Sequence, residues 1–387
     1  AATLTAEWVI REMQSSDGGY YATLDADSGD QEGGFYLWTR EAAREALAPD
    51  DFGLVAAAYG LDRPANFEGL WHLTRRPSPE ALAETFDMAP SQLERRLEAA
   101  RKRLFAAREH RERPGRDEKV LTSWNGLMIR AMADAGRRLH EPRFTASAER
   151  ALDFVRTRLT DNGRLMAVYK DGEARLTGYL DDYAFLSDAV VSLLEARWRD
   201  GDLAFALSIS ETLQSHFRDR EGGGFFFTAD DHETLLLRPK PFLDESTPSG
   251  NGIAARVLLE LGNLTGRSDF LDAAEETLRA GWNSLVEMPS MHGALLHALE
   301  DYLMPPQQVI LRGEDRNLQE WRDRLAGDFA PRRHVLAIPP EARDLPGLLA
   351  ELRSDGGQLA YVCGAHRCAP PVRDFEALER TLQLSAL

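Results

Sequence analysis

Two adjacent aspartates, Asp181 and Asp182, lie between aromatic residues in the stretch GYLDDYAFL, where a carboxyl group could act as a general acid. Helical spacing places Asp182 on the same face as Phe185 and Leu186, so its side chain is expected to point towards the core or a cavity. Loss of water at such a position raises the pKa of a carboxyl group, which suits proton transfer. Two alternatives stay open: the aspartates cap a helix, or a neighbouring cation pairs with Asp182.

Hydrolysis of a glycosidic bond needs a second carboxylate opposite the acid. The candidates for this base or nucleophile are Asp25, Asp27 and Asp244. Carboxyl groups about 5–5.5 Å apart would predict retention of configuration, and about 6.5–9.5 Å would predict inversion. The hydrolase hypothesis fails if no second carboxylate lies within roughly 10 Å of Asp182 across a cavity.

Aromatic and polar residues near the predicted helix starts fit a sugar-like ligand, whose C–H faces stack on rings while its hydroxyl groups need donors and acceptors. The predicted stacking residues are Trp124, Tyr179 and Tyr183. The predicted polar contacts are Lys119, Asn125, Asp181, Arg238, Lys240, Ser249 and Asn251. For each group, helix capping, core packing or tight helix contact is the alternative.

The sequence predicts neither a metal site nor a cofactor. Its only cysteines, Cys363 and Cys368, flank a histidine in CGAHRC, which offers at most three zinc ligands, and there is no second cysteine pair. We therefore expect buried, reduced thiols, as is usual in a reducing cytoplasm.

The charge balance limits the class of partner. The 387 residues include 46 Lys and Arg against 63 Asp and Glu, a formal charge of -17, which disfavours nucleic acid or an anionic membrane surface. No stretch approaches the roughly 18 uninterrupted apolar residues of a membrane span, and the first residues lack a secretory pattern. We expect a cytoplasmic protein that binds a small molecule. Because the chain starts without Met and within a helical pattern, we also expect that an N-terminal portion is missing.

Long amphipathic helices in pairs must position these residues. The helix predicted from about residue 123 to 139 has an apolar face and an opposite polar stripe. Its predicted buried residues are Trp124, Met128, Ala131, Ala135 and Leu139, and its polar stripe is Arg130, Asp134, Arg137 and Arg138. Similar first helices begin near residues 124, 179 and 249, each with a partner helix. Such hairpins form either an open solenoid or a ring of inner and outer helices, and the long Gly- and aromatic-rich links favour the ring.

The pattern changes after Met304, where two prolines follow a helix. The stretches QQVILRG, RHVLAIP and QLAYVCG predict three buried strands separated by helices. The sequence therefore predicts two domains, an (α/α) toroid over residues 1–304 and a small α/β subdomain over residues 305–387.

The stretches DGGYYATLDADS, EGGFYLW, DEKVLTSWNGLMIRAMADAG, GYLDDYAFL, TPSGNG and YVCGAHRCAPPV occur in this order. Together they resemble the YyaL-like family that includes spermatogenesis-associated protein 20. The resemblance implies an (α/α)6 toroid similar to six-hairpin glycosidases and N-acylglucosamine 2-epimerases. It also implies an N-terminal thioredoxin-like domain and first toroid helices that are absent here. An incomplete ring would expose apolar helix faces, so we expect either that missing companion segment or a homodimer to cover the gap.

These observations lead to two functional hypotheses. The first is a carbohydrate-active enzyme, a glycoside hydrolase before an epimerase, with Asp182 as the acid. The second is a non-catalytic ligand-binding or interaction module that partners a thioredoxin-like domain. A solvent-reachable cavity with perturbed carboxylates would favour the enzyme, whereas a filled axis or salt-paired aspartates would favour the module.

Overall fold

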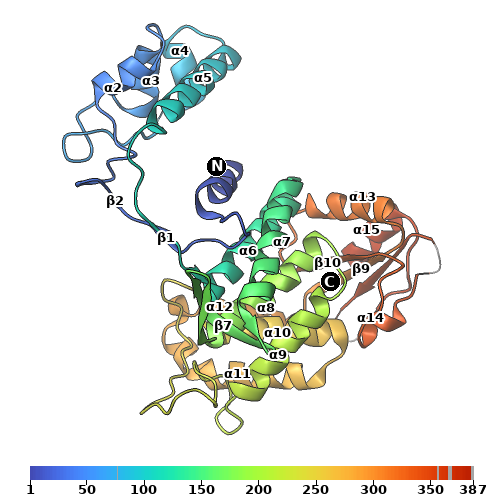
Figure 1. Ribbon diagram of the computed structural model, residues 1–387. Helices are drawn as coiled ribbons and strands as arrows, with labels where there is room; N and C mark the ends of the chain where they lie inside the picture. The colour runs from blue at the N-terminus through green and yellow to red at the C-terminus, as the bar shows by residue number, and fades with distance from the viewer. Residues whose placement is uncertain (76, 355–356, 365–367, 385–387) are drawn as a thin grey trace. The chain divides into compact units, whose positions relative to one another are not determined.

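The structure, a computed structural model, describes residues 1–75, 77–354, 357–364 and 368–384. The chain divides into two compact units (Figure 1): the first combines Ala1–Ala22 with the chain from Glu118 onward, and the second is Thr23–Asp117. Within the described ranges, no helix has both the length and the apolar character needed to cross a membrane.

Helical hairpins form most of the first unit. They are α6 (Thr122–Arg138) with α7 (Pro142–Arg158), α8 (Leu180–Ala196) with α9 (Asp202–His216), and α10 (Gly250–Thr265) with α11 (Ser268–Glu287), followed by α12 (Gly293–Leu303). The inner helices pack in succession, α6 against α8, α8 against α10 and α10 against α12, while α7, α9 and α11 each pack against their own hairpin partner (Figure 1). The predicted fold class, mainly helical with inner and outer helices, is confirmed. Before the first hairpin come α1 (Ala2–Trp8), which contacts α6, and the π-helical η1 (Val9–Met13).

Glycines allow the inner helices to approach closely at their starts. A Cβ atom at Gly126 would lie 2.7 Å from the backbone carbonyl carbon of Phe185, and one at Gly252 would lie 2.7 Å from the Cβ of Ala294. Any side chain at these positions would push the helices apart. The starts of α6 and α8, and those of α10 and α12, are therefore held in close contact.

The buried face of α6 differs from the prediction. Its buried residues are Thr122, Asn125, Gly126, Ile129, Met132, Ala133 and Gly136. Trp124 is instead 47% exposed, and Ala131 and Leu139 are also exposed. Because α8 lies so close, the face with the glycines turns inward and the bulky indole turns outward.

A small antiparallel sheet sets where α6 and α8 begin. Its strands β5 (Val120–Leu121), β6 (Thr160–Asp161) and β8 (Glu173–Thr177) all pair with β7 (Arg164–Lys170). Leu121 pairs with Val168, and α6 starts at the next residue. Only Gly178 and Tyr179 separate β8 from α8, so both helix starts are tied to strands that pair with β7.

The C-terminal part forms the three predicted strands. The sheet order is β10 (Arg333–Ile338), β9 (Gln307–Arg312), β11 (Leu359–Cys363), with β10 parallel and β11 antiparallel to β9. The helices α13 (Asp315–Ala326) and α15 (Phe375–Leu384) share an apolar cluster with this sheet, and α14 (Leu348–Glu351) contacts α10. Because β10 packs on α8 and α13 contacts α6, this part belongs to the same compact unit as the hairpins.

The second unit lies inside the region predicted as toroid. It contains α2 (Arg40–Ala46), α3 (Phe52–Tyr59), α4 (Pro79–Thr85) and α5 (Pro90–Arg108), and two short strand pairs: β1 (Thr23–Leu24) with β4 (Arg116–Asp117), and β2 (Asp27–Ser28) with β3 (Gln31–Glu32). These helices bury their apolar residues in a core of their own, which includes Leu54, Leu93 and Leu97. The structure thus divides the chain at residues 23 and 117 rather than at Met304.

Candidate functional site

The predicted acid, Asp182, is a helix-capping residue. Its Oδ2 accepts a hydrogen bond from the Tyr179 backbone N–H at 2.8 Å, and its Oδ1 accepts one from the Ser123 N–H at 2.8 Å. Burial raises the pKa of Asp182 to about 7, although these hydrogen bonds oppose the shift. The carboxyl group therefore ties the start of α8 to the start of α6, and both of its oxygens are occupied.

Asn125 and Asn251 are clamps rather than ligand contacts. Asn125 accepts a hydrogen bond from the Tyr20 N–H at 2.8 Å and donates to the carbonyl oxygens of Tyr20 at 3.0 Å and Leu121 at 2.9 Å. Asn251 accepts a hydrogen bond from the Phe225 N–H at 2.7 Å and donates to the carbonyl oxygens of Phe225 at 3.0 Å and of Pro241. Both amides are buried and bonded on both ends. The sequence prediction that they line a ligand pocket is corrected.

Asp244 and Ser249 also have structural roles. Asp244 accepts hydrogen bonds from the backbone N–H groups of Ser249 at 2.8 Å and Ala294 at 3.0 Å, so it joins α10 to α12. The Ser249 hydroxyl caps α10 by accepting from the Gly252 N–H at 3.0 Å. Asp244 thus repeats, in the last hairpin, the bridging that Asp182 provides between α6 and α8.

The predicted stacking residues do not gather around one ligand. Tyr183 is fully buried, and its hydroxyl accepts hydrogen bonds from the Leu165 N–H and from Arg164. Tyr179 stacks on Phe227, with ring centroids 5.1 Å apart. The exposed side chain of Trp124 points away from the buried face of α6.

The predicted cations are held by other groups or lie apart. Arg238 donates to the carbonyl oxygen of Thr228 at 2.6 Å, and Lys240 pairs with Asp219 at 2.6 Å. Lys119, half-buried, precedes β5. Among the described residues Arg238 and Lys240 bind these other groups, and Asp182 is held by the backbone N–H groups described above, so helix capping replaces the expected cation pair.

Asp25 and Asp27 belong to the second unit, where both are exposed, and Asp25 accepts the Asp27 N–H at 3.2 Å. They form a local turn and do not share a unit with Asp182. Of the three predicted bases, Asp244 alone shares a unit with Asp182, and it is bonded to two backbone groups.

Asp181 differs from these residues, because it has a free oxygen. Its Oδ1 is buried and has no hydrogen-bond partner among the described residues. Burial raises the pKa of Asp181 to about 6. The carboxyl group packs against Gly250 at the start of α10, so it lies at the entrance to two inner helices.

The polar stripes of the inner helices meet in a cavity of about 70 Å³, here called the inner cavity. Its lining residues are Arg130, Asp134, Arg137 and Arg138 from α6, Asp188, Ser192 and Glu195 from α8, Arg256 and Glu260 from α10, and Pro331, Arg333 and His334 in and before β10. The spacing of four and then three residues on α6 and α8 puts each stripe on one helix face. The C-terminal sheet covers this face of the hairpins, since β10 contributes His334.

Ion pairs connect the walls of the inner cavity. Asp188 pairs with both Arg130 and Arg256, so one carboxylate of α8 holds α6 and α10. Burial raises the pKa of Asp188 to about 6 while Arg130 opposes the shift, so it is anionic at neutral pH. Arg137 pairs with Asp134 at 3.1 Å and Glu195 at 2.9 Å.

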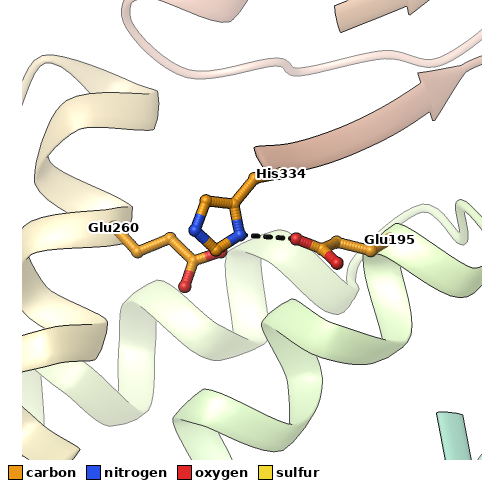
Figure 2. A group of neighbouring side chains, drawn as sticks. All are labelled: Glu195, Glu260 and His334. Carbon is orange, nitrogen blue, oxygen red and sulfur yellow. Dashed lines mark hydrogen bonds and ion pairs between the residues drawn. The ribbon is translucent and has the colours of Figure 1, made fainter. Parts of the chain in front are cut away.

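His334 lies between two glutamates, which come from different helices (Figure 2). Its Nδ1 is 2.5 Å from Glu195 Oε1 and 2.9 Å from Glu260 Oε1. Burial alone would lower the pKa of His334, but the charges of Glu260 and Glu195 raise it well above its ordinary value. Burial alone would raise the pKa of Glu260, but the charge of His334 opposes this effect and the pKa is lowered. The imidazolium therefore connects β10 to α8 and α10.

The same three side chains could in principle hold a metal ion. Their ligand atoms lie within 4.8 Å of one another, and one imidazole with two carboxylates is a donor set that zinc accepts. However, Arg137 pairs with Glu195, and four other arginines line the cavity. These guanidinium groups would repel a divalent cation. A protonated His334 instead pairs with Glu195 and Glu260 and adds a single positive charge to the cavity. The surroundings favour the protonated histidine.

A second group of potential ligands, His216, Asp230 and Asp231, lies on the surface of the hairpins. His216 Nδ1 is 2.7 Å from Asp230, and Arg164 holds Asp231 through two contacts at 2.5 and 3.0 Å. The arginine already neutralises one of the acids, so this is a surface ion-pair cluster.

The inner cavity carries an excess of positive charge. With His334 protonated, six cationic side chains face four acidic ones. The Nε atoms of Arg137 and Arg333 are buried without a hydrogen-bond partner among the described residues. A buried guanidinium N–H without an acceptor is costly, and an anionic ligand would supply one.

Sequence reasoning identified the polar stripe of α6 but did not predict that it lines a cavity. The stripe faces the inner cavity because α8 packs on α6 and the C-terminal part covers this side of the hairpins. The available signal was the presence of charged residues along the first helices that follow, Asp188 and Glu195 on α8 and Arg256 and Glu260 on α10. His334 gave no signal, because it lies in a strand far along the chain.

The expectation of reduced thiols is wrong: Cys363 and Cys368 form a disulfide. The two residues also face each other in an isolated antiparallel bridge, so the backbone brings the sulfurs together. The intervening residues 365–367, including the histidine of CGAHRC, lie outside the described residues.

Comparison with known proteins gives relatives across nearly the whole chain. Human spermatogenesis-associated protein 20 is 28% identical over 97% of this chain and 53% of that protein, and the rat protein is 27% identical over the same shares. An uncharacterised protein of Caenorhabditis elegans is 25% identical over 96% of this chain and 55% of its own length. No family model matches.

Among solved structures, an α-mannanase of Bacteroides thetaiotaomicron matches 87% of this chain and 88% of its own, with 12% identity and a TM-score of 0.41. A D-mannose isomerase matches 44% of this chain and 43% of its own, with 14% identity and a TM-score of 0.36. The sequence identities and TM-scores of both matches are too low to transfer any activity to this chain. The chain is thus a distant homologue of spermatogenesis-associated protein 20, and it spans about half the length of these curated relatives.

Proposed function

We propose that the hairpin unit is a binding module for a small polar anion, such as a sugar acid or sugar phosphate, and that the inner cavity is its site. The observation that carries this proposal is the cationic excess of the cavity together with the two buried, unpartnered guanidinium nitrogens of Arg137 and Arg333. The cavity, of about 70 Å³, suits the anionic group of such a ligand, with the rest of the ligand at the open rim. The salt-paired Asp188 supports binding rather than acid/base chemistry at this place.

Calorimetric titration tests the proposal. Glucose 6-phosphate and glucuronate should bind, and glucose, which lacks the anionic group, should bind at least about tenfold more weakly. Arg138, exposed on the rim of the cavity, is the arginine least involved in the ion pairs, so Arg138→Met should weaken anion binding without unfolding the protein. Arg158→Met, an exposed arginine at the end of α7, is the matched control and should bind like the parent. Equal binding of glucose and its phosphate, or no binding of either anion, would contradict the proposal.

A second candidate, a glycoside hydrolase, is favoured by Asp181 alone. Its free Oδ1 and a pKa of about 6 suit a general acid, unlike the fully bonded Asp182. If the chain hydrolyses any member of a panel of nitrophenyl glycosides, Asp181→Asn should abolish turnover. The neighbouring Asp182→Asn should lower protein stability instead, because it disturbs the cap shared by α6 and α8. Absence of turnover by the folded parent chain removes this candidate.

A further inference from the structure

The second unit contains a pocket of about 260 Å³ that differs in chemistry from the inner cavity. Its apolar walls include Trp38, Tyr59 and Leu104, all of which are largely buried, and Phe105, which is 38% exposed. Arg101 and Arg108 also line it, and both belong to α5, seven residues apart. The spacing of two helical turns puts these two guanidinium groups on the same helix face as Leu104. The pocket therefore combines an aromatic wall with a cationic edge.

Arg108 is the cation with the least complete set of partners. Its guanidinium carbon lies over the rings of Phe35 at 4.9 Å, Tyr36 at 5.2 Å and Phe105 at 5.0 Å, and its Nε is buried with no hydrogen-bond partner among the described residues. Among the described residues its one carboxylate contact is Glu109 at 3.5 Å, and Glu109 is bound more closely by Arg113. Aromatic rings hold the guanidinium in place, but they do not accept its N–H groups as a carboxylate would.

Tyr59 adds a neutral donor to the lining of the pocket. Its hydroxyl forms no hydrogen bond with the described residues, and burial raises the pKa of Tyr59, so the O–H keeps its proton. The nearest acids are already paired, Glu98 with Arg101 at 2.9 Å and Glu94 with Arg75 at 3.1 Å. The open donors of the pocket are thus one guanidinium edge and one phenol, set against an apolar wall.

We propose that this pocket binds a small carboxylic acid with an aromatic or other apolar body. The planar carboxylate would accept from Arg108, and the Tyr59 hydroxyl would donate to it, while the body packs on Trp38, Leu104 and Phe105. The volume of about 260 Å³ lies just below the range of drug-sized sites, which suits a small acid. A highly charged ligand such as a sugar phosphate fits poorly, because Leu73, Leu104 and Phe105 offer no hydrogen-bonding groups to its hydroxyls. This site is independent of the inner cavity and of the function proposed for it.

The test compares 4-phenylbutyrate with its neutral amide, 4-phenylbutyramide, by calorimetric titration of the whole chain. The acid should bind, and the amide should bind at least about tenfold more weakly, because a charged hydrogen bond is replaced by a neutral one. Arg108→Met keeps the length and apolar stem of the side chain and should weaken binding of the acid to the level of the amide. The matched control is Arg103→Met, an exposed arginine on the same helix, which should bind like the parent.

Tyr59→Phe gives a second variant in case loss of Arg108 disturbs the aromatic cluster. It removes only a hydroxyl that has no partner among the described residues, so the fold should persist and the affinity for the acid should fall by about three- to tenfold. Equal affinities of acid and amide would overturn the proposal, as would no binding at millimolar concentration by the folded chain, or an equal loss in Arg103→Met. None of these outcomes bears on the inner cavity, since glucose 6-phosphate binding is measured separately.

Discussion

Asn125 and Asn251 show how a single buried amide can fix a long link. Each one clamps both backbone polar groups of an aromatic residue that follows two glycines, Tyr20 after Gly18 and Gly19, and Phe225 after Gly223 and Gly224. The repetition indicates that the hairpins share one local device for attaching a link to the start of an inner helix. The sequence WNG, which looks like an odd start for an apolar helix, is explained by this clamp and by the contact at Gly126.

Asn125→Ala should therefore destabilise the protein without directly affecting a ligand. The change leaves the N–H and carbonyl groups of Tyr20 buried and unpaired, so the free energy of unfolding should fall by about 2–4 kcal/mol. Trp124→Ala, at the exposed neighbouring position, should change it by less than about 1 kcal/mol. Urea denaturation of the two variants measures both values. A larger loss for Trp124→Ala than for Asn125→Ala would mean that the indole, not the amide, anchors this helix start.

At the scale of elements, His334 couples the C-terminal sheet to the hairpins. The folded-state pKa of His334 lies above its ordinary value, so the imidazolium contributes stability that is complete below about pH 6.5 and is lost as the pH rises through the folded-state pKa. Glu260 has a lowered pKa, and its contribution is lost as the pH falls through that value. The charges of Arg130 and Arg137 also lower the pKa of Glu260. Burial raises the pKa of Asp301, which interacts with His334, to about 6, so Asp301 is largely ionised between pH 7 and pH 9.

The prediction is a pH-dependent effect of His334→Gln. The difference in unfolding free energy between the parent and the variant should be largest near pH 6 and should fall by about 1 kcal/mol or more by pH 9. His216→Gln, which removes a surface histidine beside Asp230, is the control and should show a much smaller difference at both values. Chemical denaturation at a series of pH values gives the curves. A difference that grows with pH would mean that His334 is neutral in the folded protein.

The element pattern was predictable from local signals, and the site was not. Hydrophobic periodicity and glycine turns predicted the hairpins and the three strands β9, β10 and β11, because each element buries one face. The buried face of α6 was mispredicted, since a close helix contact at Gly126 selects small residues over Trp124. The inner cavity needs three helices and a strand from a distant part of the chain, and such a meeting has no local sequence signal.

At the scale of the whole molecule, apolar side chains of α11 and α12 form an exposed surface. Trp282 and Val286 on α11 are 50% and 58% exposed, and Leu303 on α12 is 66% exposed. Trp282, Leu299 and Tyr302 line a shallow hollow between the two helices. On α12, Leu296, Leu299 and Leu303 follow helical spacing, as the face of a helix does when another helix packs on it. An exposed apolar surface of this kind suits a contact with another helix or with a second copy of the chain.

For the chain as given, we predict self-association through this surface. Light scattering during size-exclusion chromatography should show a mass that rises with concentration, and Trp282→Glu should shift the protein to the monomer, because a carboxylate would then have to be buried in the contact. Leu236→Glu, in a fully exposed loop position outside α11 and α12, is the control and should associate like the parent. A monomer at every concentration would contradict self-association. In that case a helical companion segment would be the partner of this surface, and binding of a helical peptide should change the fluorescence of Trp282.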